Sequence, residues 1–118
     1  MSAITLYHNT SCSTSRRALD AVTAAGTDAA VVQYLKTPLD REQLLELIGK
    51  LEDPPQDLVR KDPFFHQQGL RAEDYRTPEQ VADLLVRFPR LMQRPVLVRG
   101  DRAIIGRPPG RVPEFLAG

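Results

Sequence analysis

The first 35 residues predict a strand, a helix and a second strand, in that order. Residues 4–8 alternate apolar and polar side chains, as a half-buried strand does, and residues 9–14 are rich in turn-forming and helix-capping residues. An amphipathic helical pattern follows and stops at Gly26, and residues 30–35 then predict a second, buried strand. A helix that joins two parallel strands forms a right-handed crossover, which confines the chain to α/β folds.

The rest of the chain predicts a helical insertion, then two strands and a short closing helix. Residues 40–89 carry helical patterns that prolines interrupt. Two apolar runs, 96–98 and 103–105, flank a tight turn at Gly100, which is typical of a hairpin. The order β-α-β, helical insertion, β-β-α predicts an α/β protein with a thioredoxin-like fold. We expect one domain over residues 1–118, with the insertion at about 40–89.

Two positions in the insertion predict helix starts. Asp40 is a typical N-cap before an apolar helical pattern. Thr77 is followed by a proline at the first helical position and by Gln80, a combination that predicts a capping box.

Composition excludes several classes of protein. One cysteine excludes an internal disulfide or dithiol cycle, and with only two histidines the chain lacks the ligands typical of a structural zinc site. Apolar runs are far shorter than the ~18 residues of a membrane span, and no basic segment precedes an apolar one at the N-terminus. We therefore expect a cytoplasmic protein with a free thiol. A net charge of +1 argues against a dedicated partner among nucleic acids or membranes.

The charge is unevenly distributed along the chain. Residues 87–111 hold seven arginines and one acidic residue, a balance of +6, whereas residues 1–86 hold nine basic and thirteen acidic residues, a balance of −4. One interpretation is a solvated basic face. The other is that some arginines converge on a small oxyanion, which the planar guanidinium group suits well. Composition alone leaves both open.

Cys12 lies where the first strand gives way to the first helix. The positive end of a helix stabilises a thiolate, which is the nucleophilic form of cysteine. We expect His8 to supply a nearby positive charge, Ser15 to donate a hydrogen bond to the thiolate and Arg16 to add charge. The alternative is an inert, buried cysteine, which the polar neighbours on both sides disfavour.

Spacing separates Cys12 from two other kinds of cysteine site. A phosphatase loop needs arginine six residues after the cysteine, where this chain has Ala18. A dithiol motif needs a second cysteine three residues later, where it has Ser15. If Cys12 turns over through a disulfide, the second sulfur must therefore come from another molecule.

The segment from Ile4 to Arg16, with its His-x-x-x-Cys-x-x-Ser core, resembles the signature of the glutathione/glutaredoxin-linked arsenate reductase family. Four further segments resemble motifs of the same family in the same order, and the resemblance covers nearly the whole chain. They are residues 32–38, 58–61, 91–96 and 105–108.

The resemblance implies a mechanism and a set of site residues. Cys12 would be the nucleophile that forms an arsenic adduct, with His8 and Ser15 keeping the thiolate ionised. The oxyanion-binding arginines would be Arg60, Arg94 and Arg107. Supporting residues would be Asn9, Arg16 and Pro95, the last in the cis-proline position of thioredoxin-like folds. The resemblance also implies arsenate as substrate, glutathione as co-substrate, glutaredoxin as partner, and no bound cofactor or metal.

Two other readings of the same cysteine remain open. The sequence Cys12-Ser13-Thr14-Ser15 has the form of a monothiol glutaredoxin-like site, which would act on another oxyanion or on a disulfide substrate. The chain also resembles regulators of this fold that bind RNA polymerase and are not enzymes. Redox-sensing regulators of that kind carry Cys-x-x-Cys, which Ser15 breaks here.

Overall fold

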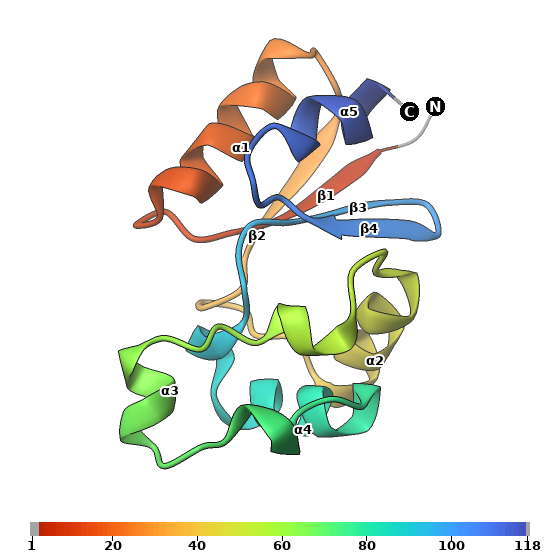
Figure 1. Ribbon diagram of the computed structural model, residues 1–118. Helices are drawn as coiled ribbons and strands as arrows, with labels where there is room; N and C mark the ends of the chain where they lie inside the picture. Colours follow the sequence, from red (N-terminus) through yellow and green to blue (C-terminus); the bar gives the residue numbers. More distant parts are fainter. Residues whose placement is uncertain (1–2, 118) are drawn as a thin grey trace.

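Four strands form one mixed sheet with helices on both of its faces (Figure 1). The computed structural model describes residues 3–117. The strand order is β2-β1-β3-β4; β1 runs parallel to β2 and antiparallel to β3, and β4 forms a hairpin with β3. The strands are β1 (Ile4–His8), β2 (Ala29–Gln33), β3 (Val96–Arg99) and β4 (Arg102–Ile105). This arrangement confirms the predicted thioredoxin-like α/β fold.

Side chains that alternate along the strands build two separate buried clusters. On one face, Leu6 and Leu97 pack against α1 (Ser13–Ala24) and α5 (Arg111–Ala117). On the other face, Val96 and its neighbours on β4 pack against the helical segment between β2 and β3. The sheet is therefore the middle of three layers, with α1 and α5 above it in Figure 1 and the helical segment below.

The helical segment contains three α-helices and three short 3₁₀ turns. The α-helices are α2 (Arg41–Lys50), α3 (Pro63–Gln67) and α4 (Pro78–Arg87). The 3₁₀ turns are η1 (Pro55–Leu58), η2 (Ala72–Asp74) and η3 (Pro89–Leu91). Both predicted helix starts are confirmed, because Asp40 caps α2 and Thr77 caps α4, each in a full capping box.

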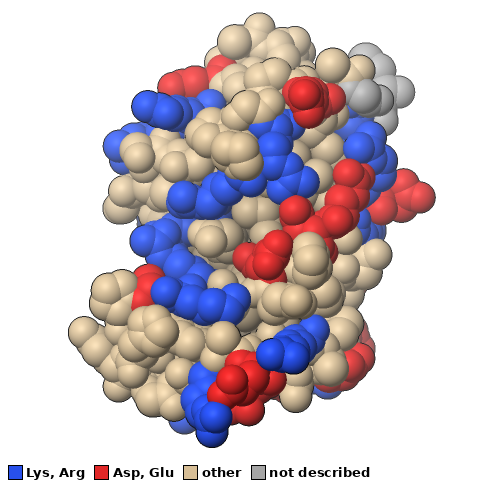
Figure 2. Space-filling view, viewed as in Figure 1, with Lys and Arg blue, Asp and Glu red and all other residues tan. Residues whose placement is uncertain are grey.

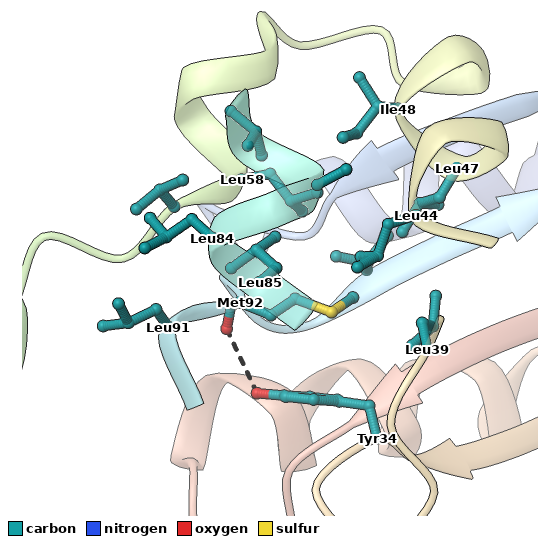
Figure 3. Packing of buried hydrophobic residues seen from close by; sticks show 14 of the residues in the cluster. Tyr34, Leu39, Leu44, Leu47, Ile48, Leu58, Leu84, Leu85, Leu91 and Met92 are labelled. Atoms are coloured by element: carbon teal, nitrogen blue, oxygen red, sulfur yellow. Dashed lines mark hydrogen bonds between the residues drawn. The ribbon is translucent and has the colours of Figure 1, made fainter. Parts of the chain in front are cut away.

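Leucine side chains of α2 and α4 interlock in the core of this segment (Figure 3). Tyr34 closes the cluster toward the sheet, and its hydroxyl donates a hydrogen bond to the carbonyl of Met92 at 3.3 Å. Since Met92 lies two residues before Arg94, this core supports the chain that leads into β3.

A strand forms where the sequence predicted one over residues 30–35, but its predicted burial is wrong. The strand is Ala29–Gln33, its first three residues are exposed, and Val31 is 43% accessible. The reason is its position: β2 is an edge strand, and within residues 3–117 neither buried cluster includes a residue of β2. The buried residue of this region is Tyr34, just past the end of the strand.

The helices of the described chain are too short and too polar to cross a bilayer, so residues 3–117 contain no candidate membrane-spanning helix.

Candidate active site

Cys12 occupies the N-cap position of α1. Its backbone is extended, its N–H donates to the carbonyl of Asn9 at 3.1 Å, and its carbonyl accepts the N–H of Arg16 at 3.0 Å. The side chain is half-buried and free. The sulfur therefore lies at the positive end of a twelve-residue helix, close to main-chain N–H groups that have no partner within the helix.

Two arginines from distant parts of the sequence meet at this sulfur. The Nη2 group of Arg107 donates to the Sγ atom of Cys12 at 3.3 Å, and its Nε group donates to the carbonyl of Arg94 at 2.7 Å. Arg94 lies just before β3 and Arg107 just after β4. The hairpin pairs Val96 with Ile105, and this pairing sets the two arginines side by side.

The bond between Arg94 and Pro95 is cis, as the resemblance implied. A second cis bond, between Arg107 and Pro108, had no counterpart among the sequence predictions. Gly106 donates to the carbonyl of Pro95 at 2.8 Å and so joins the two arginine-bearing segments.

Arg94, whose guanidinium group acts on the Cys12 thiol, holds an unused hydrogen-bond donor. Among the residues that the structure describes, its Nε atom is the one buried side-chain polar atom without a partner. Leaving a buried N–H group unpaired costs free energy, so the arrangement favours an added acceptor. An oxyanion next to Cys12 would provide one.

The surroundings of Cys12 favour its ionised form. Burial raises the pKa of the thiol, but the Ser15 N–H, the Arg94 guanidinium, the positive charge of Arg107 and the Thr14 N–H together lower that pKa below its ordinary value. The thiolate is the nucleophile, so the site is built for attack on an electrophile.

His8 and Ser15 form a buried pair behind the thiol. The Nδ1 atom of His8 and the hydroxyl of Ser15 are 2.6 Å apart, with 3% and 0% of the two residues exposed. The same hydroxyl accepts the N–H of Asn9 at 3.0 Å. The pair therefore fastens the end of β1 to the first turn of α1.

This geometry corrects two expectations. Burial, together with the charge of Arg16, lowers the pKa of His8, which disfavours the positive charge expected beside the sulfur. The Ser15 hydroxyl is engaged by His8 and Asn9, and it is the main-chain N–H of Ser15 that acts on the thiol. Buried polar groups form hydrogen bonds with one another, and the spacing of residues in the sequence does not show which groups pair.

The remaining site candidates lie near the thiol without a hydrogen bond to it. The Nη1 group of Arg16 donates to the carbonyl of Thr10 at 2.9 Å and braces the loop before Cys12. Asn9 accepts the N–H of Ser11 at 2.9 Å in the same loop. Both residues hold the loop in shape, and the expectation that Arg16 adds charge to the sulfur is not supported by its contacts.

Arg60 takes a different position from the other two arginines. Its N–H donates to the carbonyl of Leu91 at 2.7 Å, which places its main chain beside the segment that leads to Arg94. Its guanidinium group pairs with Asp62 at 3.2 Å and, in the described chain, makes no hydrogen bond to Cys12. The structure thus brings Arg94 and Arg107 to the thiol, and Arg60 only to its neighbourhood.

Tyr34 is a site neighbour that sequence reasoning missed. Burial raises the pKa of its hydroxyl, although Arg94 and Asn9 partly offset the rise, and the charge of Cys12 adds to it. In the sequence, Tyr34 is an aromatic residue near the end of a predicted strand, and this pattern does not distinguish a residue beside the active site from an ordinary core residue. Its contact with Arg94 and Asn9 follows only from the three-dimensional arrangement.

No group of three or more His, Cys, Asp or Glu side chains in residues 3–117 could hold a metal ion. The fold and the site define a thioredoxin-like protein with a single cysteine at a helix N-terminus and two arginines at its sulfur.

Comparison with known proteins identifies the family to which this chain belongs. The ArsC family model matches residues 7–115. An Escherichia coli K12 protein named arsenate reductase is 34% identical over 116 residues, which cover 98% of this chain and 82% of that protein. A Neisseria meningitidis protein of the same name is 34% identical over 114 residues, covering 92% of this chain and 93% of its own. The solved structure of an arsenate reductase from Vibrio cholerae superimposes with a TM-score of 0.83 at 27% identity, covering 96% of this chain and 97% of the other. The chain belongs to the ArsC family.

Proposed function

We propose that this protein reduces arsenate to arsenite, with Cys12 as the nucleophile. The observation that carries the proposal is the contact between Arg107 and the sulfur of Cys12 at 3.3 Å, to which Arg94 adds a second guanidinium group with an unpaired Nε atom. A thiolate and an arsenate ion repel each other. Guanidinium groups at the sulfur offset that repulsion and stabilise the oxygens as charge shifts during attack. The names of the family relatives support this choice of substrate.

The proposed chemistry starts with attack of the Cys12 thiolate on arsenic. A sulfur–arsenic bond forms, and one arsenate oxygen leaves as water after protonation. Glutathione then replaces a second arsenic oxygen, which leaves as water, and the glutaredoxin thiol attacks the glutathione sulfur, so that these two thiols become a mixed disulfide while As(V) becomes As(III). Water then cleaves the bond between arsenic and the Cys12 sulfur, which releases arsenite and restores the Cys12 thiol. Both reductants are external because the chain has a single cysteine. We place the reaction in the cytoplasm, where such thiols are kept reduced.

Arg60 belongs to the proposal as the third oxyanion-binding arginine. Its main chain lies beside the segment that leads to Arg94, and its ion pair with Asp62 is partly buried. The Arg60 side chain is 33% exposed in this pair, so an incoming oxyanion can reach the guanidinium group and compete with Asp62 for it.

The test is consumption of NADPH in the presence of arsenate, glutathione, glutaredoxin and glutathione reductase. We expect arsenate-dependent turnover by the native protein and none by Cys12→Ser, because a serine hydroxyl at this position is not ionised. Circular dichroism confirms that the variant is folded. Turnover that survives in Cys12→Ser would refute the mechanism. Reduction of a glutathionylated substrate, without any reduction of arsenate, would assign the monothiol oxidoreductase function instead.

A further inference from the structure

Asp62 holds the guanidinium group of Arg60 and also begins helix α3. Its Oδ2 atom accepts a hydrogen bond from the Nε group of Arg60 at 3.2 Å, and its Oδ1 atom accepts the N–H of Phe65 at 3.0 Å. The second bond makes Asp62 the N-cap of α3, and its side chain is only 16% exposed. The cap and the burial therefore fix this carboxylate in place, whether or not Arg60 stays paired with it.

The main chain brings Arg60 close to the guanidinium group of Arg94. The N–H of Arg60 donates to the carbonyl of Leu91, and the Nη1 group of Arg94 turns back to donate to the carbonyl of Arg90 at 3.4 Å. The two arginines therefore contact neighbouring carbonyls of one segment. Figure 2 shows Lys and Arg side chains gathered on this face of the molecule, between the α1–α5 layer and the helical segment. An anion held by Arg94 lies within range of the charges of Arg60 and Asp62.

The surroundings of Asp62 keep its carboxylate ionised. Burial raises its pKa, but the N–H of Phe65, the hydrogen bond and charge of Arg60, and the charge of Arg90 together lower that pKa below its ordinary value. The carboxylate is therefore negative at neutral pH. It cancels part of the positive charge that Arg60 offers to an oxyanion, and it occupies one of the guanidinium donors.

We propose that Asp62 sets the affinity of the oxyanion site by holding and partly neutralising Arg60. Phosphate has the same charge and tetrahedral shape as arsenate, so a more positive site would bind both more tightly and would fill with unreactive phosphate. Tighter binding of the ground state alone does not speed the reaction. A restrained Arg60 therefore keeps the thiolate accessible to arsenate. The proposal rests on the proposed function for the place of Arg60 in the oxyanion site.

The experiment measures how phosphate protects Cys12 from alkylation by iodoacetamide, at constant ionic strength and without arsenate. The dependence of the alkylation rate on phosphate concentration gives a dissociation constant for each variant. Asp62→Asn removes the charge and keeps an oxygen for the N–H of Phe65, because asparagine is an equally good N-cap. We expect the dissociation constant of phosphate to fall about tenfold in Asp62→Asn, since an opposing charge is removed at short range.

Two further backgrounds test whether the effect passes through Arg60. Arg60→Gln should bind phosphate about tenfold more weakly than the native protein, because one guanidinium group is lost. Adding Asp62→Asn to Arg60→Gln should tighten binding only about twofold, since residues that act as a pair are not additive. Asp83→Asn is the matched control, because Asp83 is an exposed carboxylate that pairs with Arg41. This control should leave the dissociation constant unchanged.

The outcomes separate this proposal from the proposed function. An unchanged or higher dissociation constant in Asp62→Asn overturns the proposal, as does an equal gain in the Arg60→Gln background or in Asp83→Asn. Phosphate that protects Cys12 in no variant also overturns it, whether or not the protein reduces arsenate. The expected pattern of protection without arsenate turnover supports this proposal and refutes the proposed function. Arsenate turnover with no response of phosphate binding to Asp62→Asn overturns this proposal alone.

Discussion

The sulfur of Cys12 is influenced by main-chain dipoles and by charged side chains, and the two contributions can be separated by mutation. Replacing Arg107 with Gln removes a positive charge at 3.3 Å and leaves the helix N-terminus intact. The lowered pKa of the Cys12 thiol should rise in this variant, so the midpoint of its alkylation by iodoacetamide should move to higher pH. Arsenate turnover should fall by roughly a hundredfold or more, as when one transition-state donor is removed.

Arg71→Gln is the control, because Arg71 is exposed and pairs with Glu73 on the 3₁₀ turn η2. Both variants lose one positive charge. An alkylation midpoint that does not move in Arg107→Gln, or that moves equally in Arg71→Gln, would contradict a direct effect of Arg107 on the sulfur.

At this scale the sequence predicted residue identities better than residue contacts. Cys12, Arg94 and Arg107 were named as candidates from motifs, and the structure brings them together. The lowered pKa of His8 and the contacts of the Ser15 hydroxyl with His8 and Asn9 were not predicted. Both depend on burial and on competition among neighbouring polar groups, and a one-dimensional motif contains neither quantity.

Among the elements, the β3–β4 hairpin is flanked by Arg94 and Arg107, and Gly106, just after β4, is closely packed. A Cβ atom at this glycine would lie 2.8 Å from Cγ of Pro95 and 3.2 Å from side-chain atoms of Leu97 and Val112. The proline ring cannot rotate away. Gly106→Ala should therefore destabilise the fold by about 1–3 kcal/mol through overpacking, and it should lower turnover because Pro95 and its neighbour Arg94 must shift.

Gly49→Ala is the matched control, because Gly49 lies on α2 with open space around it. Alanine there should stabilise the helix by about 0.5–1 kcal/mol. Urea unfolding monitored by circular dichroism measures both variants. A Gly106→Ala protein as stable and as active as the native one would refute the tight contact.

Elements with strong local signals were predictable, and the exposure of β2 was not. The capping boxes at Asp40 and Thr77 depend on residues within one helical turn, so the sequence contains all the necessary information. The burial of β2 depends on which strand pairs with which. An apolar run such as residues 29–33 is compatible with a central strand or an edge strand, and only the sheet order decides between them.

For the molecule as a whole, the helical segment and the sheet share one buried cluster. Leu85 on α4 is 2% exposed in this cluster, so Leu85→Ala should cost about 2–5 kcal/mol of unfolding free energy. Val86 on the same helix is 45% exposed, and Val86→Ala should stay within about 0.5 kcal/mol of the native protein.

Because the cluster is continuous, unfolding should be a single transition in both variants. Urea unfolding followed by circular dichroism and by tyrosine fluorescence tests this, since the chain has three tyrosines and no tryptophan. Transitions that separate between the two probes would show that the helical segment unfolds independently of the sheet. The sequence predicted that this segment is helical; its attachment to the sheet depends on contacts between distant residues.

Cys12 is free and half-buried, and the chain has no other cysteine. Labelling of this thiol therefore measures the number of protein molecules that carry a reactive cysteine. One bound maleimide or one added alkyl mass can belong to only one atom, so intact mass spectrometry gives the fraction of occupied sites without peptide mapping. The molar ratio of label to protein then reports what share of a preparation is competent. Rates can be expressed per working molecule, even in a partly oxidised sample.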